Sequence, residues 1–495
     1  MESSSSKSCL NLSNAVFYFL LLLVIFPVWL GDSPAMVDFP QHIAQLTALK
    51  AIFLGNEFYA ALYEINWFTP YIVSNLILLI FSFVLSPLVA LKLGVTFYLI
   101  SIPLVTGLIA KKIGRPVDLR LITIPFLYCF PFNWGFVPFL ITVGFGIIWI
   151  YYFLCFNNNP NSYINIFLSF FIIYSHAIAW GIVMLYITLF SVRKGINYYV
   201  IKGIVKLSFP VVFVAVWMYQ IKISATSVSE VELFNYYPLI YRFSSFFVGN
   251  LMGNDIVLGF LKLILMYFIV RSKTIVKTSF NIYILFALAT VMLFFTMPNR
   301  LFSTGFFSDR LLILFPVFLA LSINEIHSKN KFYILIFIAT TLSFSPRVTR
   351  VLESNDEIKA IYELSEGIKE KQKLIFLTNK HEYMSNRYRL LSEPQFLWLP
   401  QMLVTKMELE IDFNFAYFHP EMVRFSENAE MKVKKFSFIS RYDYPNVNWE
   451  DYSYYDYILI RDCSINELNG STQRGNGRFV MKETSGCWYL LARKL

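Results

Sequence analysis

The stretch AVFYFLLLLVIFPVWL, residues 15–30, carries no charge and is followed directly by GDSPAMVDFPQH, residues 31–42. Uncharged apolar runs of this kind form helices that cross the roughly 30 Å hydrocarbon core of a membrane. The SPA at residues 33–35 is a weak match to a signal-peptide cleavage site, so we predict that residues 15–30 remain as a first membrane span. The polar run that follows would then lie at the membrane surface.

The composition extends this prediction to most of the chain. Of 495 residues, 57% are hydrophobic, 18% are aromatic and only 15% are charged. These values exclude an ordinary soluble globular protein. The net charge of +10 is spread between apolar segments and forms no single basic face. We therefore expect membrane lipids as partners, and no nucleic acid.

Basic clusters predict the threading, because Lys and Arg collect on the cytoplasmic side of membrane proteins. The clusters lie at residues 111–115, 193–206, 271–277 and 329–331. They predict an α-helical polytopic protein with about eleven spans, near residues 15–30, 87–110, 119–132, 136–156, 163–175, 178–191, 204–220, 255–270, 282–297, 311–323 and 332–344. If the apolar segment 71–85 crossed the membrane, the basic cluster at residues 111–115 would lie on the outer side. We therefore expect a re-entrant or interfacial helix there. The alternative is that it crosses and that residues 163–191 form one long helix.

After Pro346 the charges become frequent and the apolar runs shorten to strand length. Three such runs, at residues 373–379, 455–462 and 487–495, follow a helical pattern around residues 355–371. We predict a transmembrane domain of residues 1–345 and a separate α/β domain of residues 346–495. An odd number of spans places the second domain on the exoplasmic side of the inner (plasma) membrane, which is the periplasm in a Gram-negative cell.

The five cysteines show no C-x-x-C spacing, so a zinc site is not expected. Cys463 and Cys487 both fall beside predicted strands, and a disulfide between them would suit an oxidising compartment. Unpaired buried thiols are the expected arrangement.

On this threading, the polar residues that packing explains least emerge on the exoplasmic side. Ionisable groups at the lipid boundary are costly and are therefore functional candidates. The candidates are Asp32, Asp38 and His42 in the first outer loop, Asn133 and Trp134 in the second, His176 at the start of the sixth span, and Arg300, Asp309 and Arg310 before the tenth.

Asp38 has two interpretations. Asp is a preferred N-cap and Pro suits the first helical turn, so Asp38 could simply cap an interfacial helix at residues 40–54. Alternatively, Asp38 accepts a proton from a sugar or lipid hydroxyl, with His42 one turn later orienting it or sharing a metal. Asp32 is close enough in sequence to support either role.

Arg310 and His176 also have structural alternatives. An Arg at the head of a span can snorkel or pair with its neighbour Asp309. Its guanidinium also suits a phosphate, with Arg300 near enough to help. His176 alone is typical of a hydrogen-bonded histidine in a helix bundle, but it falls on the same side as Asp38.

The order of these features resembles that of the family C glycosyltransferase (GT-C) superfamily. The resemblance covers most of the chain at low specificity. It rests on the acidic loop GDSPAMVDFPQH, on TPYIVSNLILLIF with SPLVALKLG, on SDRLLILFP, and on the terminal strands YDYILI and GCWYLLARKL.

The resemblance implies an enzyme that moves a sugar from a polyprenyl-phosphate donor to a glycan or lipid acceptor of the cell envelope, such as lipopolysaccharide, usually with inversion. Asp38, or otherwise Asp32, matches the catalytic position, and Arg310 would bind the carrier phosphate. Many members carry Asp-Asp or Asp-Glu in the first loop, whereas Phe39 follows Asp38 here. Dependence on a divalent metal, Mg²⁺ or Mn²⁺, therefore stays open, with His42 or His176 as replacement ligands.

Two other functions compete with glycosyl transfer. A transporter or polymerase of surface polysaccharide has a similar number of spans, but transporters tend to show internal repeats and midplane charges, which are not visible in this sequence. A non-catalytic envelope protein would need far fewer spans as an anchor.

Overall fold

The computed structural model describes residues 2–224, 234–244, 246, 281–301, 305–378, 394–411, 415–417, 421–426, 429, 449–463 and 478–494. The chain divides into two units. The first comprises Met1–Trp29, Phe68–Leu76 and Lys92–Val348, and the second comprises Leu30–Trp67, Ile77–Leu91 and Thr349–Leu495.

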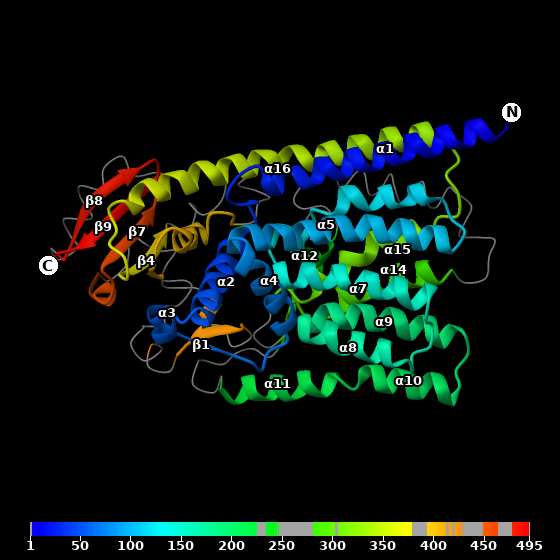
Figure 1. Cartoon of the computed structure of the whole chain (residues 1–495), viewed down its shortest axis with the longest axis horizontal. Coiled ribbons are helices and arrows are strands. Elements are labelled where there is room, and N and C mark those ends of the chain that lie inside the picture. The colour runs from blue at the N-terminus through cyan, green and yellow to red at the C-terminus, as the bar shows by residue number, and fades with distance from the viewer. Residues whose placement is uncertain are drawn as a thin grey trace. The chain divides into compact units, whose positions relative to one another are not determined.

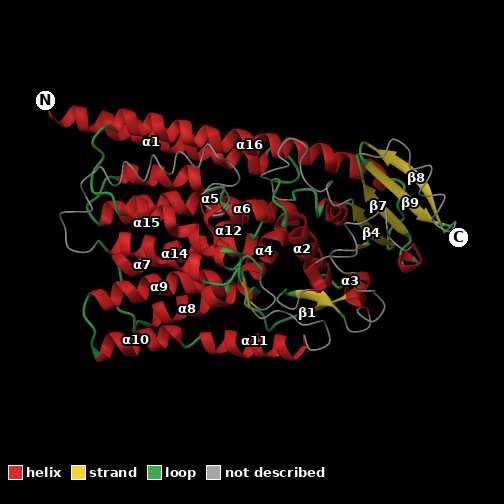
Figure 2. Ribbon diagram, turned by 180° about the vertical axis from the view of Figure 1, so that it is seen from behind, coloured by secondary structure: helices red, strands yellow, loops and turns green. Residues whose placement is uncertain are grey.

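The first unit is almost entirely helical, and its long helices run roughly parallel to one another (Figures 1 and 2). The α-helices are α1 (Glu2–Trp29), α6 (Phe130–Trp134), α7 (Val137–Cys155), α8 (Tyr163–Ser175), α9 (Ala177–Arg193), α10 (Tyr198–Ser208), α11 (Val211–Ser224), α12 (Leu239–Ser244), α14 (Ile282–Thr296) and α15 (Phe315–Leu321). Asparagine side chains cap the N-termini of α10 and α14. The Asn197 and Asn281 side chains each accept a hydrogen bond from a backbone N–H of the first turn. Two short strands, β2 (Phe234–Asn235) and β3 (Arg300–Leu301), pair antiparallel.

Three further helices contribute residues to both units: α4 (Ile72–Val84), α5 (Pro87–Lys112) and α16 (Lys329–Ser365). The apolar segment 71–85 forms a helix, α4, as predicted. α16 continues unbroken through Pro346. The change of composition at residue 346 therefore falls inside a helix.

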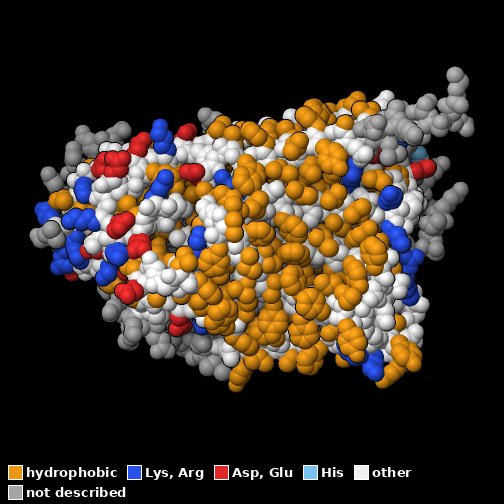
Figure 3. Space-filling model, viewed as in Figure 1, with side chains coloured by type: hydrophobic (Ala, Val, Ile, Leu, Met, Phe, Trp, Pro, Cys, Tyr) orange, Lys and Arg blue, Asp and Glu red, His pale blue; other side chains and the backbone are white. Residues whose placement is uncertain are grey.

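Apolar side chains cover the outer face of the helical bundle (Figure 3). Leu22, Phe167 and Val205 are exposed examples. Among the described residues, five helices are long and apolar enough to cross a membrane: Leu12–Trp29, Pro87–Lys112, Val137–Cys155, Tyr198–Gln220 and Lys329–Ser365. The chain is an integral membrane protein. The predicted span 255–270 lies outside the described residues, so the total of eleven spans stays a prediction.

The segment predicted as the third span, residues 119–132, is not an α-helical span. It forms a 3-10 helix, η1 (Val117–Phe126), and then the short helix α6. Pro125 and Pro131 lack the amide hydrogen that a continuous α-helix needs, which explains the break. The segment predicted as the tenth span likewise begins as a 3-10 helix, η4 (Ser308–Leu314), before α15.

Buried polar contacts hold the first turn of η1. Ser13 and Tyr333 both donate hydrogen bonds to the Asp118 carboxylate. Arg120 donates to Oδ1 of Asn14 at 2.7 Å. These contacts join η1 to α1 and to the first part of α16.

The second unit combines helices with a mixed β-sheet. The five strands lie in the order β5-β4-β7-β9-β8, with β5, β4 and β7 parallel and β7, β9 and β8 antiparallel. β4, β7 and β9 fall in the predicted strand segments, and Ile375, Leu377, Ile458 and Ile460 lie in the core beside them. The elements are α2 (Phe39–Phe53), α3 (Glu57–Leu62), β1 (Tyr63–Ile65), β4 (Lys373–Thr378), η5 (Leu399–Thr405), β5 (Glu410–Ile411), η6 (Phe415–Tyr417), β6 (Val423–Phe425), η9 (Trp449–Tyr452), β7 (Tyr457–Arg461), β8 (Phe479–Ser485) and β9 (Trp488–Arg493).

Residues 30–67 of the first outer loop belong to this second unit. β1 pairs antiparallel with β6, which joins residues 63–65 to residues 423–425. The C-terminal residues therefore pack with a segment that lies several hundred residues earlier in the sequence. The predicted boundary at residue 346 did not place these two segments in one domain.

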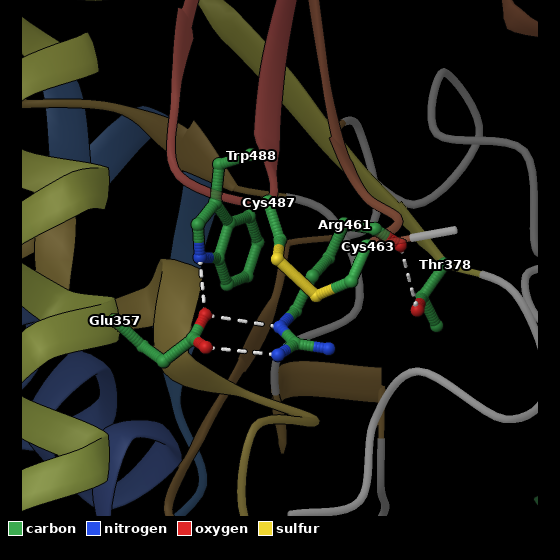
Figure 4. The surroundings of a disulfide bond; sticks show 6 residues. All are labelled: Glu357, Thr378, Arg461, Cys463, Cys487 and Trp488. Atoms are coloured by element: carbon green, nitrogen blue, oxygen red, sulfur yellow. Dashed lines mark hydrogen bonds and ion pairs between the residues drawn. A yellow bond between two sulfur atoms is a disulfide. The ribbon is translucent and has the colours of Figure 1, made fainter. Parts of the chain in front are cut away.

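A disulfide joins Cys463 to Cys487 (Figure 4). The expectation of unpaired thiols is wrong. The register of the sheet explains the pairing, because β7 and β9 are antiparallel with Arg461 opposite Trp488. Each cysteine lies one or two residues beyond this matched pair, so the two side chains meet at the same end of the sheet.

A buried ion pair lies beside the disulfide (Figure 4). Arg461 is 1% exposed and donates twice to Glu357 of α16, at 2.8 Å and 3.0 Å. Trp488 Nε1 donates to the same carboxylate at 2.6 Å. Glu357 therefore fixes the last turns of α16 to β7 and β9.

We expect the double variant Cys463→Ser, Cys487→Ser to lower the free energy of unfolding of the sheet by about 3 kcal/mol. The two cysteines are 24 residues apart in sequence, and closing a loop of that size restricts the unfolded chain by about this much. The measurement is the rate of native-state proteolysis within residues 349–495. Cys155→Ser removes a free cysteine outside the sheet and is the matched control. Equal proteolysis rates for the double variant and the control would contradict a stabilising role for the bond.

Candidate functional site

Asp38 precedes the first residue of α2, but its side chain makes no capping hydrogen bond. Its Oδ1 instead accepts a hydrogen bond from Nε1 of Trp398 at 3.1 Å. The interpretation of Asp38 as a simple helix cap is therefore wrong. The side chain is 7% exposed, and a carboxylate buried this far is costly unless other groups support it. Such groups are candidates for chemistry.

The loop that leads to Asp38 has an unusual backbone. Ala35 has φ of 53°, in the left-handed region that only glycine enters without cost. A Cβ at Gly31 would lie 1.7 Å from the Asn355 side chain, so any other residue at position 31 would displace that side chain. Asn355 Oδ1 in turn accepts from the Ser33 backbone N–H at 3.5 Å. Strain of this kind concentrates at functional sites.

The other first-loop candidates differ from one another. Asp32 is exposed, so it lacks the enclosed surroundings of Asp38. His42 is buried, and its ring lies edge-on to Phe415 at 5.2 Å. Gln41 accepts from the Phe415 backbone N–H at 2.9 Å. The first turn of α2 is thus held by residues of the C-terminal segment.

The surroundings of Asp38 and His42 bear on the metal site that the sequence left open. Among the residues that the structure describes, no three His, Cys, Asp or Glu side chains cluster closely enough to hold a metal ion. Asp38 lies against an indole N–H, and His42 lies against an aromatic ring. Dependence on Mg²⁺ or Mn²⁺ stays a prediction to be tested.

In the first unit, Arg310 of η4 and His176 come together from positions 134 residues apart. Arg310 Nη1 lies 3.4 Å from His176 Nε2. The guanidinium also lies over the ring of Phe136, 3.9 Å from its centroid, and 5.8 Å from that of Phe139. Both polar side chains are buried, at 7% and 3% exposed. The sequence names both residues as candidates for binding the substrate on the exoplasmic side, and that role stays a prediction.

The hydrogen bonds at His176 indicate which of its ring nitrogens carries the hydrogen. His176 Nδ1 already accepts from the backbone N–H of Ile178 at 3.3 Å. A neutral imidazole can accept at only one nitrogen, and a guanidinium can only donate. An imidazolium would place two cations in contact. The imidazole therefore carries its hydrogen on Nε2, the nitrogen that faces the Arg310 guanidinium.

Two candidates of the second outer loop lie on α6. Asn133 is buried, and its Oδ1 accepts from Arg347 Nη1 at 3.1 Å. Arg347 also lies over the Phe132 ring at 4.9 Å. Trp134 contacts Phe306 at 4.3 Å between ring centroids. Asn133 thus positions a buried cation, and Trp134 belongs to an aromatic cluster.

The remaining two candidates flank the turn before η4. Asp309 is buried beside Arg310 in η4. Arg300 is exposed on β3, so it differs from the buried Arg310. Its predicted help in binding an anion stays a prediction.

Two residues that the sequence reasoning missed belong with these clusters. Arg347 lies at the outer end of the last predicted span. Arg310 was chosen because it lies at the outer end of a predicted span, so the same signal could have found Arg347. Trp398 carries no comparable signal, because its partner Asp38 is 360 residues away.

An apolar cavity of about 360 Å³ lies next to His176. It is lined by residues of the first unit, among them Tyr71, His176, Trp180, Trp217, Leu293 and Phe307. Its walls offer hydrocarbon and aromatic surface with one imidazole. The cavity therefore suits the apolar part of an amphiphile whose anionic group reaches His176 and Arg310.

No protein-family model matches the sequence, and no curated protein matches it. Two solved structures share its fold. The crystal structure of ArnT from Cupriavidus metallidurans in the apo state aligns over 99% of this chain and 98% of its own, with a TM-score of 0.52 and 11% identity. The single-particle cryo-EM structure of the arabinofuranosyltransferase AftD from Mycobacteria aligns over 98% of this chain, with a TM-score of 0.51 and 8% identity. This chain spans only 40% of the AftD chain.

Proposed function

Because this chain has the GT-C fold that both solved structures share, we propose that it is a membrane glycosyltransferase. It moves a sugar from a polyprenyl-phosphate donor to a glycan or lipid acceptor of the cell envelope. The observation that carries the proposal is the meeting of Arg310 and His176 beside an apolar cavity. A lipid-linked phosphate needs both a cationic group and a dry apolar surface.

The donor phosphate binds at Arg310. Its planar guanidinium is stacked on Phe136 and so presents a fixed pair of N–H donors. In the reaction the bond between the anomeric carbon and the phosphate oxygen breaks, and negative charge grows on that oxygen. A cation held in place before this charge develops stabilises the transition state.

Asp38 is the general base. Its carboxylate takes the proton of the acceptor hydroxyl while the hydroxyl oxygen attacks the anomeric carbon. One glycosidic bond forms, the bond to phosphate breaks, and the proton ends on Asp38. Attack from the face opposite the leaving phosphate inverts the anomeric configuration.

The transfer takes place outside the cytoplasm, with the second unit on the exoplasmic side of the plasma membrane. The Cys463–Cys487 disulfide supports this orientation, because such bonds persist in oxidising compartments.

The direct test mixes the purified full chain with a radiolabelled polyprenyl-phosphoryl sugar and lipid or glycan acceptors from the host envelope. Label should appear in a new glycosidic bond, and mass analysis of surface glycans with and without the protein names the sugar. A transporter would move the donor without forming that bond. Movement of label with no new bond would refute the transferase proposal.

Trp398 acts as a positioning residue for Asp38. We expect Trp398→Phe to lower kcat about tenfold with KM unchanged, because the ring stays but the hydrogen bond to Oδ1 is lost. A purely structural role would reduce the amount of folded protein and leave kcat per folded molecule intact. Kinetics on protein quantified by size-exclusion chromatography separate these outcomes.

A further inference from the structure

We propose that the rings of Phe130, Trp134 and Phe306 form a stacking surface for the pyranose ring of the donor sugar. This aromatic surface would sit at the end of the donor opposite its lipid chain. The inference rests on the proposed function and adds the class of sugar and the residues that select it.

The three rings converge from two loops. The centroids of Trp134 and Phe306 are 4.3 Å apart, those of Phe130 and Phe306 are 5.2 Å apart, and those of Phe130 and Trp134 are 5.6 Å apart. All three side chains are half-buried, so each keeps part of its ring accessible. Rings that only filled a core would be enclosed like Phe132 and Phe139, which are fully buried.

The backbone at Phe306 is held in an unfavourable conformation. Its φ is 55°, in the left-handed region that bulky residues avoid. In this conformation Phe306 contacts Trp134, whereas the next residue, Phe307, lines the apolar cavity. One strained turn therefore supplies a ring to the aromatic surface and a ring to the cavity, which is a reason for the strain to be kept.

Phe136 connects the aromatic surface to Arg310. Its centroid is 6.3 Å from that of Phe306 and 6.4 Å from that of Trp134, and the Arg310 guanidinium lies over it at 3.9 Å. Contacts link the apolar cavity to His176, His176 to Arg310, Arg310 to Phe136, and Phe136 to the aromatic surface. A polyprenyl-phosphoryl sugar has the same order of chemistry: apolar chain, phosphate, sugar ring.

Stacking on an aromatic face selects the ring form of the sugar. The C–H bonds of a sugar ring carry slight positive charge and are attracted to the negative face of the π-system. A pyranose in a chair presents several such C–H groups on one flat side, and a furanose presents fewer. The aromatic surface therefore favours a pyranosyl donor.

The test measures binding of three probes to the purified full chain in nanodiscs: farnesyl phosphate, farnesyl-phosphoryl-glucopyranose and farnesyl-phosphoryl-arabinofuranose. In the wild type, the glucopyranose should bind more tightly than the bare phosphate. Trp134→Ala should weaken binding of the glucopyranosyl probe about five- to tenfold and change binding of bare farnesyl phosphate less than about twofold. Trp134→Phe, which restores a ring, should recover most of the loss.

Phe306→Gly also removes a ring, and glycine tolerates the positive φ at this position, so the variant adds no backbone strain. It should weaken binding of the glucopyranosyl probe and leave binding of bare farnesyl phosphate nearly unchanged. Phe167→Ala, at an exposed ring of α8, is the matched control and should change neither probe. An equal effect of Trp134→Ala on bare and sugar-bearing probes, or a furanosyl probe that binds as well as the pyranosyl one, overturns this inference alone. Failure of all three probes to bind the wild type overturns the donor proposal itself.

Discussion

Asp38→Asn should lower kcat for sugar transfer about 10³-fold, the range expected when a general base is removed. Asn keeps the size of the side chain, and its Oδ1 can still accept the hydrogen bond from Trp398. The substitution therefore removes the proton acceptor while leaving the packing of α2 in place. Donor binding should not change, because the base acts on the acceptor hydroxyl.

The matched control for this substitution is Glu57→Gln. Glu57 lies in the same unit, at the start of α3, and its carboxylate is exposed. Single-turnover rates with a saturating donor measure the chemical step alone. If Asp38→Asn transfers sugar as fast as Glu57→Gln, another group is the base.

Much of the helical architecture can be predicted from the sequence because the signals are local. Residues 163–175 were predicted as a span and form α8 with the same limits, since polar Asn and Pro residues precede it and His176 ends it. The helix after Asp38 begins one residue before the predicted position, because Pro40 suits the first turn.

The failures have non-local causes. η1 replaces a predicted span where Pro125 and Pro131 interrupt the α-helix, and the contacts that hold its Asp118 come from Ser13 and Tyr333, which are distant in sequence. The disulfide depends on the register of β7 against β9, which spacing alone does not reveal. Local signals indicated a cap at Asp38, but the residue that holds its side chain lies 360 positions later.

The candidate site follows the same division. Charge and position along the chain identified Asp38, His176 and Arg310, because each is a polar group next to an apolar run. Burial then separated Asp38 from Asp32 and Arg310 from Arg300, and burial is a property of the packed structure. A sequence can therefore nominate such residues, whereas choosing between neighbours requires coordinates.

Arg310→Gln should weaken binding of farnesyl phosphate and lower the rate of transfer about 10²-fold or more, the cost of removing one preorganised donor at a developing anion. The loss has two parts. The ground-state phosphate loses its cation, and the leaving oxygen loses the group that stabilises its growing charge. Binding and single-turnover rate should therefore both fall, in contrast to Asp38→Asn, where only the rate falls.

Arg310→Lys tests whether charge alone suffices. Lys keeps the charge but lacks the planar fork that stacks on Phe136 and offers paired donors. We expect it to recover part of the binding of farnesyl phosphate and little of the rate. Arg193→Gln, an exposed guanidinium at the end of α9, is the matched control. Binding of the phosphate probe by Arg310→Gln at wild-type strength would show that the anion is held elsewhere, and the paired donors facing His176 would then serve only to pack the bundle.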